Sequence, residues 1–380
     1  MTITFTIMLS VWLLPLSSCR LVIQPKLVAN EKLIDIPKFD PNDYNIVIHY
    51  ETYKAEDGSE GYRLKVEDNC VAKAQQADTA RIKYTTFTKK AASKCKINSQ
   101  TYPVLFDTGN PRLAHITTAH VQENQLPIYP LTFTTSNHKT VDFGVAMIEK
   151  LKIGDLMITN LPAEYRYYHT GYLPLGIPII ELGQDKEINI PLSVMQKFKY
   201  ITFDSIKNQM EFSLKKSFSP ANCERCQGAC NSWKSYPLMT TEDGYIYIKS
   251  TLEGVPVRLL VDTGSEGDLI LTKDSFDKMI EKQPKLLKAW KLNKTGHAPI
   301  AGGDFSYQSY FVNGLTFDQY KYNLHTIVEV VGEDIIYDLL EEIELDGIIG
   351  FPFFEDTVMA LDFEHGKMWV KKARNSRFLQ

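Results

Sequence analysis

The chain has 380 residues, a length that suits one large domain or two medium ones. Its 42 basic and 46 acidic residues give a net charge of −4, which argues against a nucleic-acid-binding surface because such a surface needs clustered basic residues. Hydrophobic residues make up 44% and charged residues 23%, as in ordinary globular proteins. The composition therefore excludes a disordered chain, a collagen and a coiled coil.

The first 19 residues are typical of a segment that directs export. Ile3 to Leu16 carries no charge, and Ser17, Ser18 and Cys19 follow it. This stretch is shorter than the roughly 20 residues of a membrane-spanning helix, so it favours a signal peptide. Leu16 to Cys19 also resembles a bacterial lipobox, in which the Cys carries a lipid. We expect an exported protein that is secreted or membrane-anchored, the anchor being a lipid on Cys19 or the apolar segment.

Five further cysteines suggest disulfide bonds. Cys70 and Cys95 could form a bridge, while Cys223, Cys226 and Cys230 lie in one short stretch rich in Asn, Gly and Ser. A structural zinc site needs four ligands, and no fourth Cys or His lies near these three. We therefore expect one or two disulfides and no metal, with one thiol left over from the odd number.

The sequence contains an internal repeat. Ile97 to Gly109 reads INSQTYPVLFDTG, and Leu252 to Gly264 reads LEGVPVRLLVDTG. In both, a polar pair, a Pro and an apolar run lie between a leading aliphatic residue and Asp-Thr-Gly. This pattern predicts a hairpin whose second strand is buried, because a continuous apolar run marks a strand covered on both faces.

Two later segments also match each other. Pro174 to Ile180 and Ile348 to Phe354 share an apolar-Gly-x-Pro pattern. Each precedes a strand–turn–strand pattern, Tyr200 to Phe212 in the first case and Val358 to Val370 in the second. The same features thus occur twice in the same order, which predicts two homologous lobes.

The repeated features and the segments around them divide the chain into six parts. An additional hairpin is predicted for Tyr44 to Glu67, ahead of the first lobe, and a helix capped by Thr272 is predicted in the second. The predicted parts are a signal peptide or lipoprotein signal (1–19), an N-terminal extension (20–79), the N-terminal lobe (80–216), a Cys-containing connector (217–235), the C-terminal lobe (236–373) and a tail (374–380).

Phe106-Asp107-Thr108-Gly109 and Val261-Asp262-Thr263-Gly264 resemble the paired motifs of the two-lobed aspartic proteases, the pepsin-like family. The short hairpin before each motif also resembles the retropepsin-like branch. Leu175-Gly176 and Ile348-Ile349-Gly350 resemble the family's second signature, and the resemblance covers roughly residues 80 to 373. It implies a mainly β fold, with two homologous β-barrel-like lobes and an active-site cleft between them.

The resemblance implies that Asp107 and Asp262 are catalytic. Two carboxylates a few ångströms apart cannot both ionise cheaply, so they share a proton and titrate as a pair. The charged member takes a proton from a water that attacks the peptide carbonyl, while the protonated member polarises that carbonyl. Threonine hydroxyls hold the two loops together, and glycines let them approach each other. The residues expected to support the pair are Thr108, Gly109, Thr263, Gly264 and Ser265.

One neighbour of the pair departs from the family pattern. Ser265 fits, but Asn110 stands where pepsin-like enzymes usually carry a Ser that donates a hydrogen bond to the outer oxygen of its own Asp. Asn can also donate, although its longer side chain can sit differently. The adjacent Arg112 either reaches inward, where it would lower the pKa of a carboxyl group, or faces solvent.

Two segments are candidates for the flaps that bind substrate in this family. In the first lobe the tip lies within Ser136 to Thr140 and includes Asn137 and His138, without the Tyr that pepsin-like flaps usually carry. In the second lobe Gly302 and Gly303 would let the backbone bend over a substrate, or they form an ordinary turn.

The sequence therefore predicts an exported aspartic endopeptidase that needs no cofactor and no metal. It would act as a monomer on a peptide or protein substrate, without nucleic acid. The alternative is a non-catalytic peptide- or protein-binding module on the same fold, favoured by Asn110 and the missing flap Tyr. Residues 20–79 hold 8 basic and 11 acidic residues, so they favour a structural extension over an inhibitory prosegment, which tends to be basic.

Overall fold

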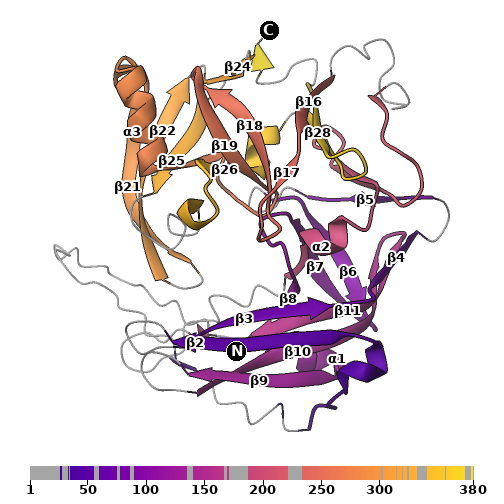
Figure 1. Cartoon of the computed structure of the whole chain (residues 1–380). Helices are drawn as coiled ribbons and strands as arrows, with labels where there is room; N and C mark the ends of the chain where they lie inside the picture. The colour runs from indigo at the N-terminus through magenta and orange to yellow at the C-terminus, as the bar shows by residue number, and fades with distance from the viewer. Residues whose placement is uncertain are drawn as a thin grey trace, which may run out of the picture. The chain divides into compact units, whose positions relative to one another are not determined.

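The chain folds mainly into β-strands, as predicted (Figure 1). One compact unit comprises Asn30–Tyr167 and Asp185–Gln380. A second unit contains the short strands β1 (Lys26–Leu27) and β12 (His169–Thr170), which pair antiparallel with each other. The computed structural model describes residues 26–27, 33, 35–54, 60–74, 78–85, 90–134, 140–166, 169–170, 187–220, 233–300, 303–313, 315–318, 320–322, 325–331, 340–355, 357–372 and 378–379.

Each Asp-Thr-Gly motif follows a β-hairpin. In the first lobe β6 (Ala92–Ile97) pairs antiparallel with β7 (Gln100–Asp107). In the second lobe β18 (Ile246–Leu252) pairs in the same way with β19 (Val255–Asp262). The three residues before each Asp are buried, as a strand covered on both faces requires. The predicted pair of hairpins is confirmed.

The strands of the first lobe form a barrel-like sheet. Their order is β4-β11-β8-β13-β7-β6-β10-β9, and β10 also pairs with β11. This additional pairing closes a ring through β10, β11, β8, β13, β7 and β6. The remaining bounds in this lobe are β4 (Val71–Ala74), β8 (Ala114–Thr117), α1 (Thr118–Asn124), β9 (Ile128–Thr134), β10 (Thr140–Ile153), β11 (Leu156–Arg166) and β13 (Ile188–Pro191).

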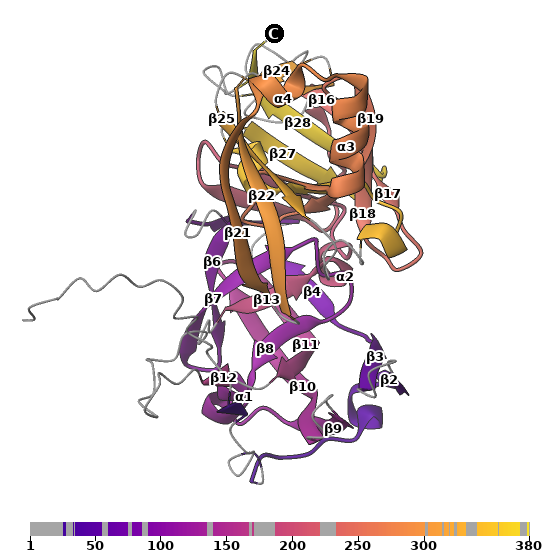
Figure 2. The same ribbon diagram turned by 90° about the vertical axis from the view of Figure 1, so that its left-hand side faces the viewer.

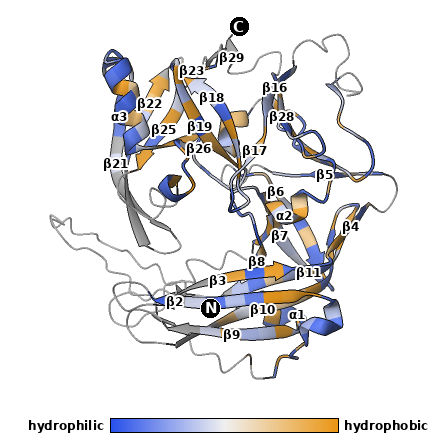
Figure 3. Cartoon of the chain, viewed as in Figure 1, coloured by the Kyte–Doolittle hydropathy of each residue, from blue (hydrophilic) through white to orange (hydrophobic). Residues whose placement is uncertain are grey.

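The second lobe repeats this plan in a larger sheet, ordered β21-β22-β25-β20-β26-β19-β18-β23-β24-β29, with β17 paired to β18. Thr272 caps α3 (Lys273–Lys282) as predicted, its side chain accepting a hydrogen bond from the Ser275 N–H. Figure 3 shows α3 mostly in polar colours, while β22 and β25 carry apolar residues. The remaining bounds are β17 (Met239–Thr240), β20 (Leu269–Thr272), α4 (Leu286–Ala289), β21 (Lys291–Ile300), β22 (Gly303–Asn313), β23 (Thr316–Phe317), β24 (Tyr320–Tyr322), β25 (His325–Val331), β26 (Gly347–Gly350) and β29 (Phe378–Leu379).

The strand that lies beside β7 is not the one expected from the sequence. β13 pairs parallel with β7 and places Pro191 opposite Asp107, just as β26 pairs parallel with β19 and places Gly350 opposite Asp262. The predicted counterpart, Leu175-Gly176, lies outside the described residues. The glycine pattern could not locate β13, because this strand ends in Pro where β26 ends in Gly.

A six-stranded sheet joins the two lobes. Its order is β16-β28-β27-β14-β15-β5, and its central pair is β14 with β27, one strand from each lobe. The predicted strand–turn–strand segments form β14–β15 and β27–β28. The bounds are β5 (Thr79–Lys83), α2 (Leu192–Met195), β14 (Tyr200–Asp204), β15 (Gln209–Ser213), β16 (Trp233–Pro237), η6 (Phe351–Phe354), β27 (Thr357–Asp362) and β28 (Lys367–Lys372).

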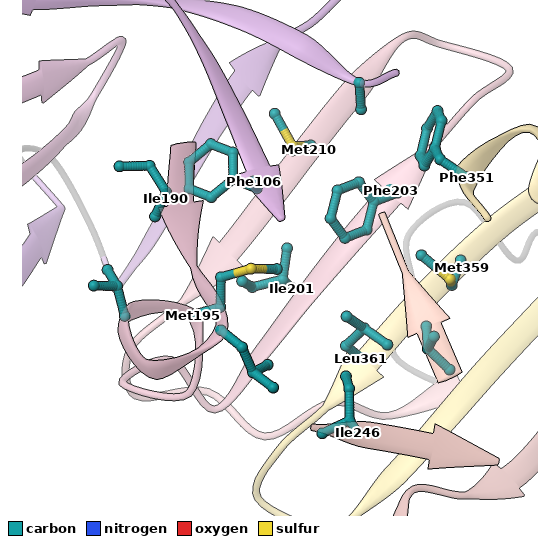
Figure 4. Close-up of a cluster of buried hydrophobic side chains, with 14 of the residues drawn as sticks. Phe106, Ile190, Met195, Ile201, Phe203, Met210, Ile246, Phe351, Met359 and Leu361 are labelled. Carbon is teal, nitrogen blue, oxygen red and sulfur yellow. The ribbon is translucent and has the colours of Figure 1, made fainter. Parts of the chain in front are cut away.

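One hydrophobic core extends beneath this sheet and into both lobes. Figure 4 shows Phe106, Ile190 and Phe203 in the same cluster as Phe351 and Leu361. The rings of Phe203 and Phe351 meet edge to face, with their centroids 5.8 Å apart. The lobes are therefore joined by apolar packing as well as by strand pairing.

The predicted hairpin before the first lobe is confirmed as β2 (Val47–Lys54) paired with β3 (Glu60–Glu67). It follows η2 (Pro41–Tyr44), and Figure 2 shows it beside β9 and β10. Ile46, Leu64 and Phe143 belong to one buried cluster, which joins the hairpin to β10. The hairpin thus packs on the outside of the first lobe.

The expected Cys70–Cys95 bridge is absent. Both residues are free thiols in the structure, and burial raises the pKa of each to about 12, which makes both unreactive. Cys19, Cys223, Cys226 and Cys230 lie outside the described residues. Among the residues that are described, no helix has the length and apolar character needed to cross a bilayer.

Candidate active site

The two motif loops meet where the lobes join. β7 ends at Asp107 and β19 ends at Asp262, and both side chains are only partly exposed. The structure brings the two carboxyl groups into direct contact, with a hydrogen bond between the Asp107 and Asp262 side chains. The sequence predicted this pairing from the duplicated motif.

The threonines of the motifs bind each loop to the opposite one. The Thr108 hydroxyl donates to the Val261 carbonyl at 2.6 Å and accepts from the Thr263 N–H at 2.9 Å. The Thr263 hydroxyl donates to the Phe106 carbonyl at 2.5 Å and accepts from the Thr108 N–H at 3.1 Å. Both side chains are buried, so these reciprocal bonds satisfy every polar atom they involve and fix the separation of the loops.

The glycines of the motifs allow the carboxyl groups to approach. A Cβ atom on Gly109 would lie 2.5 Å from Cγ of Asp262 and 2.6 Å from its two carboxylate oxygens. A Cβ atom on Gly264 would likewise lie 2.4 Å from Cγ of Asp107. Any side chain at either position would push the opposite Asp away, so the contact between the two carboxyl groups requires glycine in both loops.

Main-chain N–H groups hold the inner oxygens of the pair. Gly109 donates to Oδ1 of Asp107 at 2.8 Å, and Gly264 donates to Oδ1 of Asp262 at the same distance. Ser265 adds a second N–H to Oδ1 of Asp262 at 3.1 Å. The two loops therefore hold Oδ1 in the same way, apart from the additional Ser265 bond in the second.

The pKa of Asp262 lies well above its usual range. Burial is the main cause, and the charge of Asp107 and the hydrogen bond with it raise the pKa further. The N–H groups of Gly264 and Ser265 oppose this rise, because they favour the ionised form. The pair therefore favours one shared proton over two negative charges.

An unexpected residue completes the surroundings of Asp107. Asn189 on β13 donates its side-chain amide to Oδ2 of Asp107. Asn110 points elsewhere: its amide donates to Oδ1 of Asn189 at 3.0 Å and to the Leu113 carbonyl at 2.6 Å. The outer oxygen of Asp107 is thus held by a strand residue instead of the residue that follows the motif. The available signal in the sequence is a single polar residue inside the otherwise apolar strand Ile188–Pro191.

Ion pairs connect the lobes on either side of the pair. Arg112 faces solvent, the second of the two orientations considered from the sequence, and its guanidinium binds the carboxylate of Asp243 in the second lobe at 3.1 Å. Lys90, just before β6, binds Glu266, just after the second motif, also at 3.1 Å.

Both predicted flap segments lie at the ends of long hairpins. β9 pairs with β10 up to Thr134 and Thr140, and β21 pairs with β22 up to Ile300 and Gly303. The tip residues Asn137, His138 and Gly302 lie outside the described residues, and Gly303 begins β22. The hairpins are confirmed, while the substrate-binding role of their tips stays a prediction.

A cavity of about 790 Å³ opens between the N-terminal hairpin and the second lobe. Its lining includes Tyr50 and Lys65 of the hairpin, Arg112 of the first lobe, and Glu242 and Asp243 of the second. Within the described part of the chain, no three His, Cys, Asp or Glu side chains gather as a metal site requires.

Comparison with solved structures returned proteins of low similarity. The crystal structure of an aspartic proteinase from Irpex lacteus is 12% identical, with a TM-score of 0.45, over 78% of this chain and 98% of that one. Conglutin gamma, a basic 7S globulin from lupine seeds, is 11% identical, with a TM-score of 0.41, over 78% of this chain and 95% of that one. No protein-family model matches the chain, and no curated protein does.

The strand order itself defines the architecture. Both lobes place a hairpin before an Asp-Thr-Gly loop, a parallel strand beside that loop, and a second hairpin in the shared sheet. The chain therefore has a mainly β, two-lobed, aspartic protease-like fold with barrel-like sheets.

Proposed function

We propose that this protein is an aspartic-type endopeptidase of the pepsin-like family. The observation that carries the proposal is the contact between the Asp107 and Asp262 carboxyl groups, held by the reciprocal bonds of Thr108 and Thr263. A non-catalytic binding module would not need two carboxyl groups held together at a cost in electrostatic repulsion. The intact pair therefore favours the enzyme over that alternative.

The two carboxyl groups divide the chemistry between them. Ionised Asp107 takes a proton from a water molecule, whose oxygen forms a bond to the carbonyl carbon of the peptide. Asp262, whose pKa is raised, gives the proton of the pair to the carbonyl oxygen. The tetrahedral intermediate then breaks its C–N bond: Asp107 passes the proton that it took from water to the nitrogen, and Asp262 regains a proton from a hydroxyl of the intermediate. The products are an acid and an amine, and the pair returns to its starting protonation. This reaction proceeds without a covalent enzyme intermediate.

The substrate is a peptide or protein segment in extended conformation. The hairpins β9–β10 and β21–β22 are suited to cover such a segment. The segment would form main-chain hydrogen bonds with them, as an added β-strand does. One chain supplies both aspartates, so a monomer suffices. We also propose that the protein acts outside the cytoplasm, secreted or membrane-anchored, because an uncharged segment and Cys19 lie at its N-terminus.

The test is cleavage of a mixed pool of unstructured peptides between pH 3 and pH 7.5. The wild type should cut the pool, and Asp107→Asn and Asp262→Asn should each lower kcat at least about 10³-fold, because each removes one half of the acid–base pair. Asp78→Asn is the matched control, since Asp78 only pairs with Lys215 at the surface. A wild type that is inert over the whole range, while all four proteins are folded, would replace the enzyme with the binding module.

A further inference from the structure

The two aspartates have different surroundings despite the symmetry of their loops. Asp107 receives the side-chain amide of Asn189 on Oδ2, in addition to the Gly109 N–H on Oδ1. By strand register, Asn189 lies opposite Leu105, and the equivalent residue in the second lobe is Ile348, opposite Leu260. An isoleucine cannot donate a hydrogen bond, so the second lobe lacks this contact.

The direction of the Asn189 amide is set by its neighbours. The Leu113 carbonyl can only accept, so Asn110 must present its NH₂ group there, and the same NH₂ group donates to the Asn189 oxygen. Asn189 is left with its own NH₂ group facing Asp107. The Asn110 oxygen in turn accepts from the Arg112 N–H at 3.3 Å. This chain of bonds fixes a donor on the outer oxygen of Asp107.

A fixed donor acts differently on the two protonation states of a carboxyl group. An N–H that points at a carboxylate stabilises the ionised form, and one that points at a carboxylic acid gains much less. Asp107 therefore has a donor that favours its charge, whereas burial and the neighbouring charge oppose ionisation of Asp262. Two other groups act on the pair, since the Ser265 N–H binds Asp262 and the charge of Lys90 acts on Asp107. Asn189 on β13 adds a side-chain donor that only Asp107 receives.

We propose that Asn189 is a positioning residue that holds Asp107 as the ionised member of the pair, with Asn110 orienting its amide. The catalytic part of this inference rests on the proposed peptidase function. Its electrostatic part concerns only the folded protein, so it can be measured without substrate.

The first test is the pH profile of kcat/KM for Asn189→Leu, which keeps the approximate shape but removes the donor. Loss of the donor should shift the acidic limb of the profile to higher pH by about one unit, because the ionised form of Asp107 loses a stabilising hydrogen bond. Asn189→Asp should also move this limb upward, because it replaces the NH₂ donor with a third carboxyl group. The control is Asn42→Leu, which removes a comparable amide-to-carboxylate bond to Asp40 far from the site and should leave the profile unchanged.

Asn110→Ala tests the orienting bond. It should move the acidic limb in the same direction by a smaller amount. The Asn189 amide can still contact Asp107, but no bond from Asn110 then fixes which of its ends faces the carboxyl group. The double variant with Asn189→Leu should shift no further than Asn189→Leu alone, because both changes act through one bond. Additive shifts would overturn the role given to Asn110.

The second test measures melting temperature from pH 2.5 to pH 7 and needs no activity. The loss of melting temperature caused by Asn189→Leu should be larger at pH 7, where Asp107 is ionised, and should shrink toward pH 2.5. A loss that is equal at both ends, together with an unmoved acidic limb, would reduce Asn189 to a structural hydrogen bond. An inert wild type would count against the peptidase, while the melting curves would still decide the role of Asn189.

Discussion

At the scale of single residues, Asp262 makes the stability of the fold depend on pH. Burial, the charge of Asp107 and the hydrogen bond with it raise the pKa of Asp262 in the folded chain above its value in the unfolded chain. Between these two pKa values the folded protein binds more protons than the unfolded one. The stability that this proton provides is complete below the unfolded pKa, near 4, and is lost as the pH rises through the folded value.

Asp262→Asn should remove this pH dependence. Asn carries no proton to lose, so the melting temperature of the variant should gain on the wild type as the pH rises above about 4. The measurement is a series of melting curves from pH 3.5 to pH 7, with Asp78→Asn as the control for a change of charge at the surface. Parallel curves for wild type and Asp262→Asn would show that Asp262 has an ordinary pKa.

At the scale of elements, the hairpin β2–β3 and the segment before it pack against the β9–β10 hairpin. Main-chain bonds join the segment before it to β9: the Phe39 N–H donates to the Ile128 carbonyl at 3.1 Å, and the Ile128 N–H donates to the Pro37 carbonyl at 2.8 Å. Tyr50 on β2 donates its hydroxyl to the Thr132 carbonyl. These contacts favour a structural extension over an inhibitory prosegment, because they make the extension part of the packing of the first lobe.

Leu64→Ala should therefore weaken the first lobe instead of activating it. Leu64 is 6% exposed within the cluster that joins the hairpin to β10, so its truncation should cost about 2–4 kcal/mol of unfolding free energy. Hydrogen exchange in β9 should accelerate. Val47→Ala, at a position 50% exposed on the same hairpin, should change stability by less than about 0.5 kcal/mol. A gain in peptidase activity with unchanged stability would support a prosegment.

Elements were predictable from sequence where one local pattern sufficed. The hairpins at Asp107 and Asp262 carry continuous apolar runs before a turn-forming motif, so their pairing and burial could be inferred directly. β13 could not be identified, because its place beside β7 depends on parallel pairing over more than 80 residues of separation. Asn189 was missed for the same reason: a lone polar residue in a short strand gains meaning only when its neighbour is known to be Asp107.

At the scale of the whole molecule, the two lobes share their structure across the central sheet. β14 and β27 pair over five residues, from Tyr200 opposite Asp362 to Asp204 opposite Val358. Each lobe adds an outer strand in the same way, β5 beside β15 and β16 beside β28. The sequence predicted two lobes from the repeat, but it held no signal for this shared sheet, since the partner of each hairpin lies in the other half of the chain.

A shared sheet and a shared core predict that both lobes unfold together. Phe351 of the second lobe is 2% exposed, and its ring lies 5.8 Å from that of Phe203 and 5.9 Å from that of Tyr84. Phe351→Ala should lower the free energy of unfolding by about 3–5 kcal/mol and lower the melting temperature of both lobes, in one transition. Ile206→Ala, at a position 55% exposed in the β14–β15 turn, should leave the melting temperature nearly unchanged. Scanning calorimetry decides the matter: two resolved transitions, with only one displaced by Phe351→Ala, would mean that the lobes fold independently.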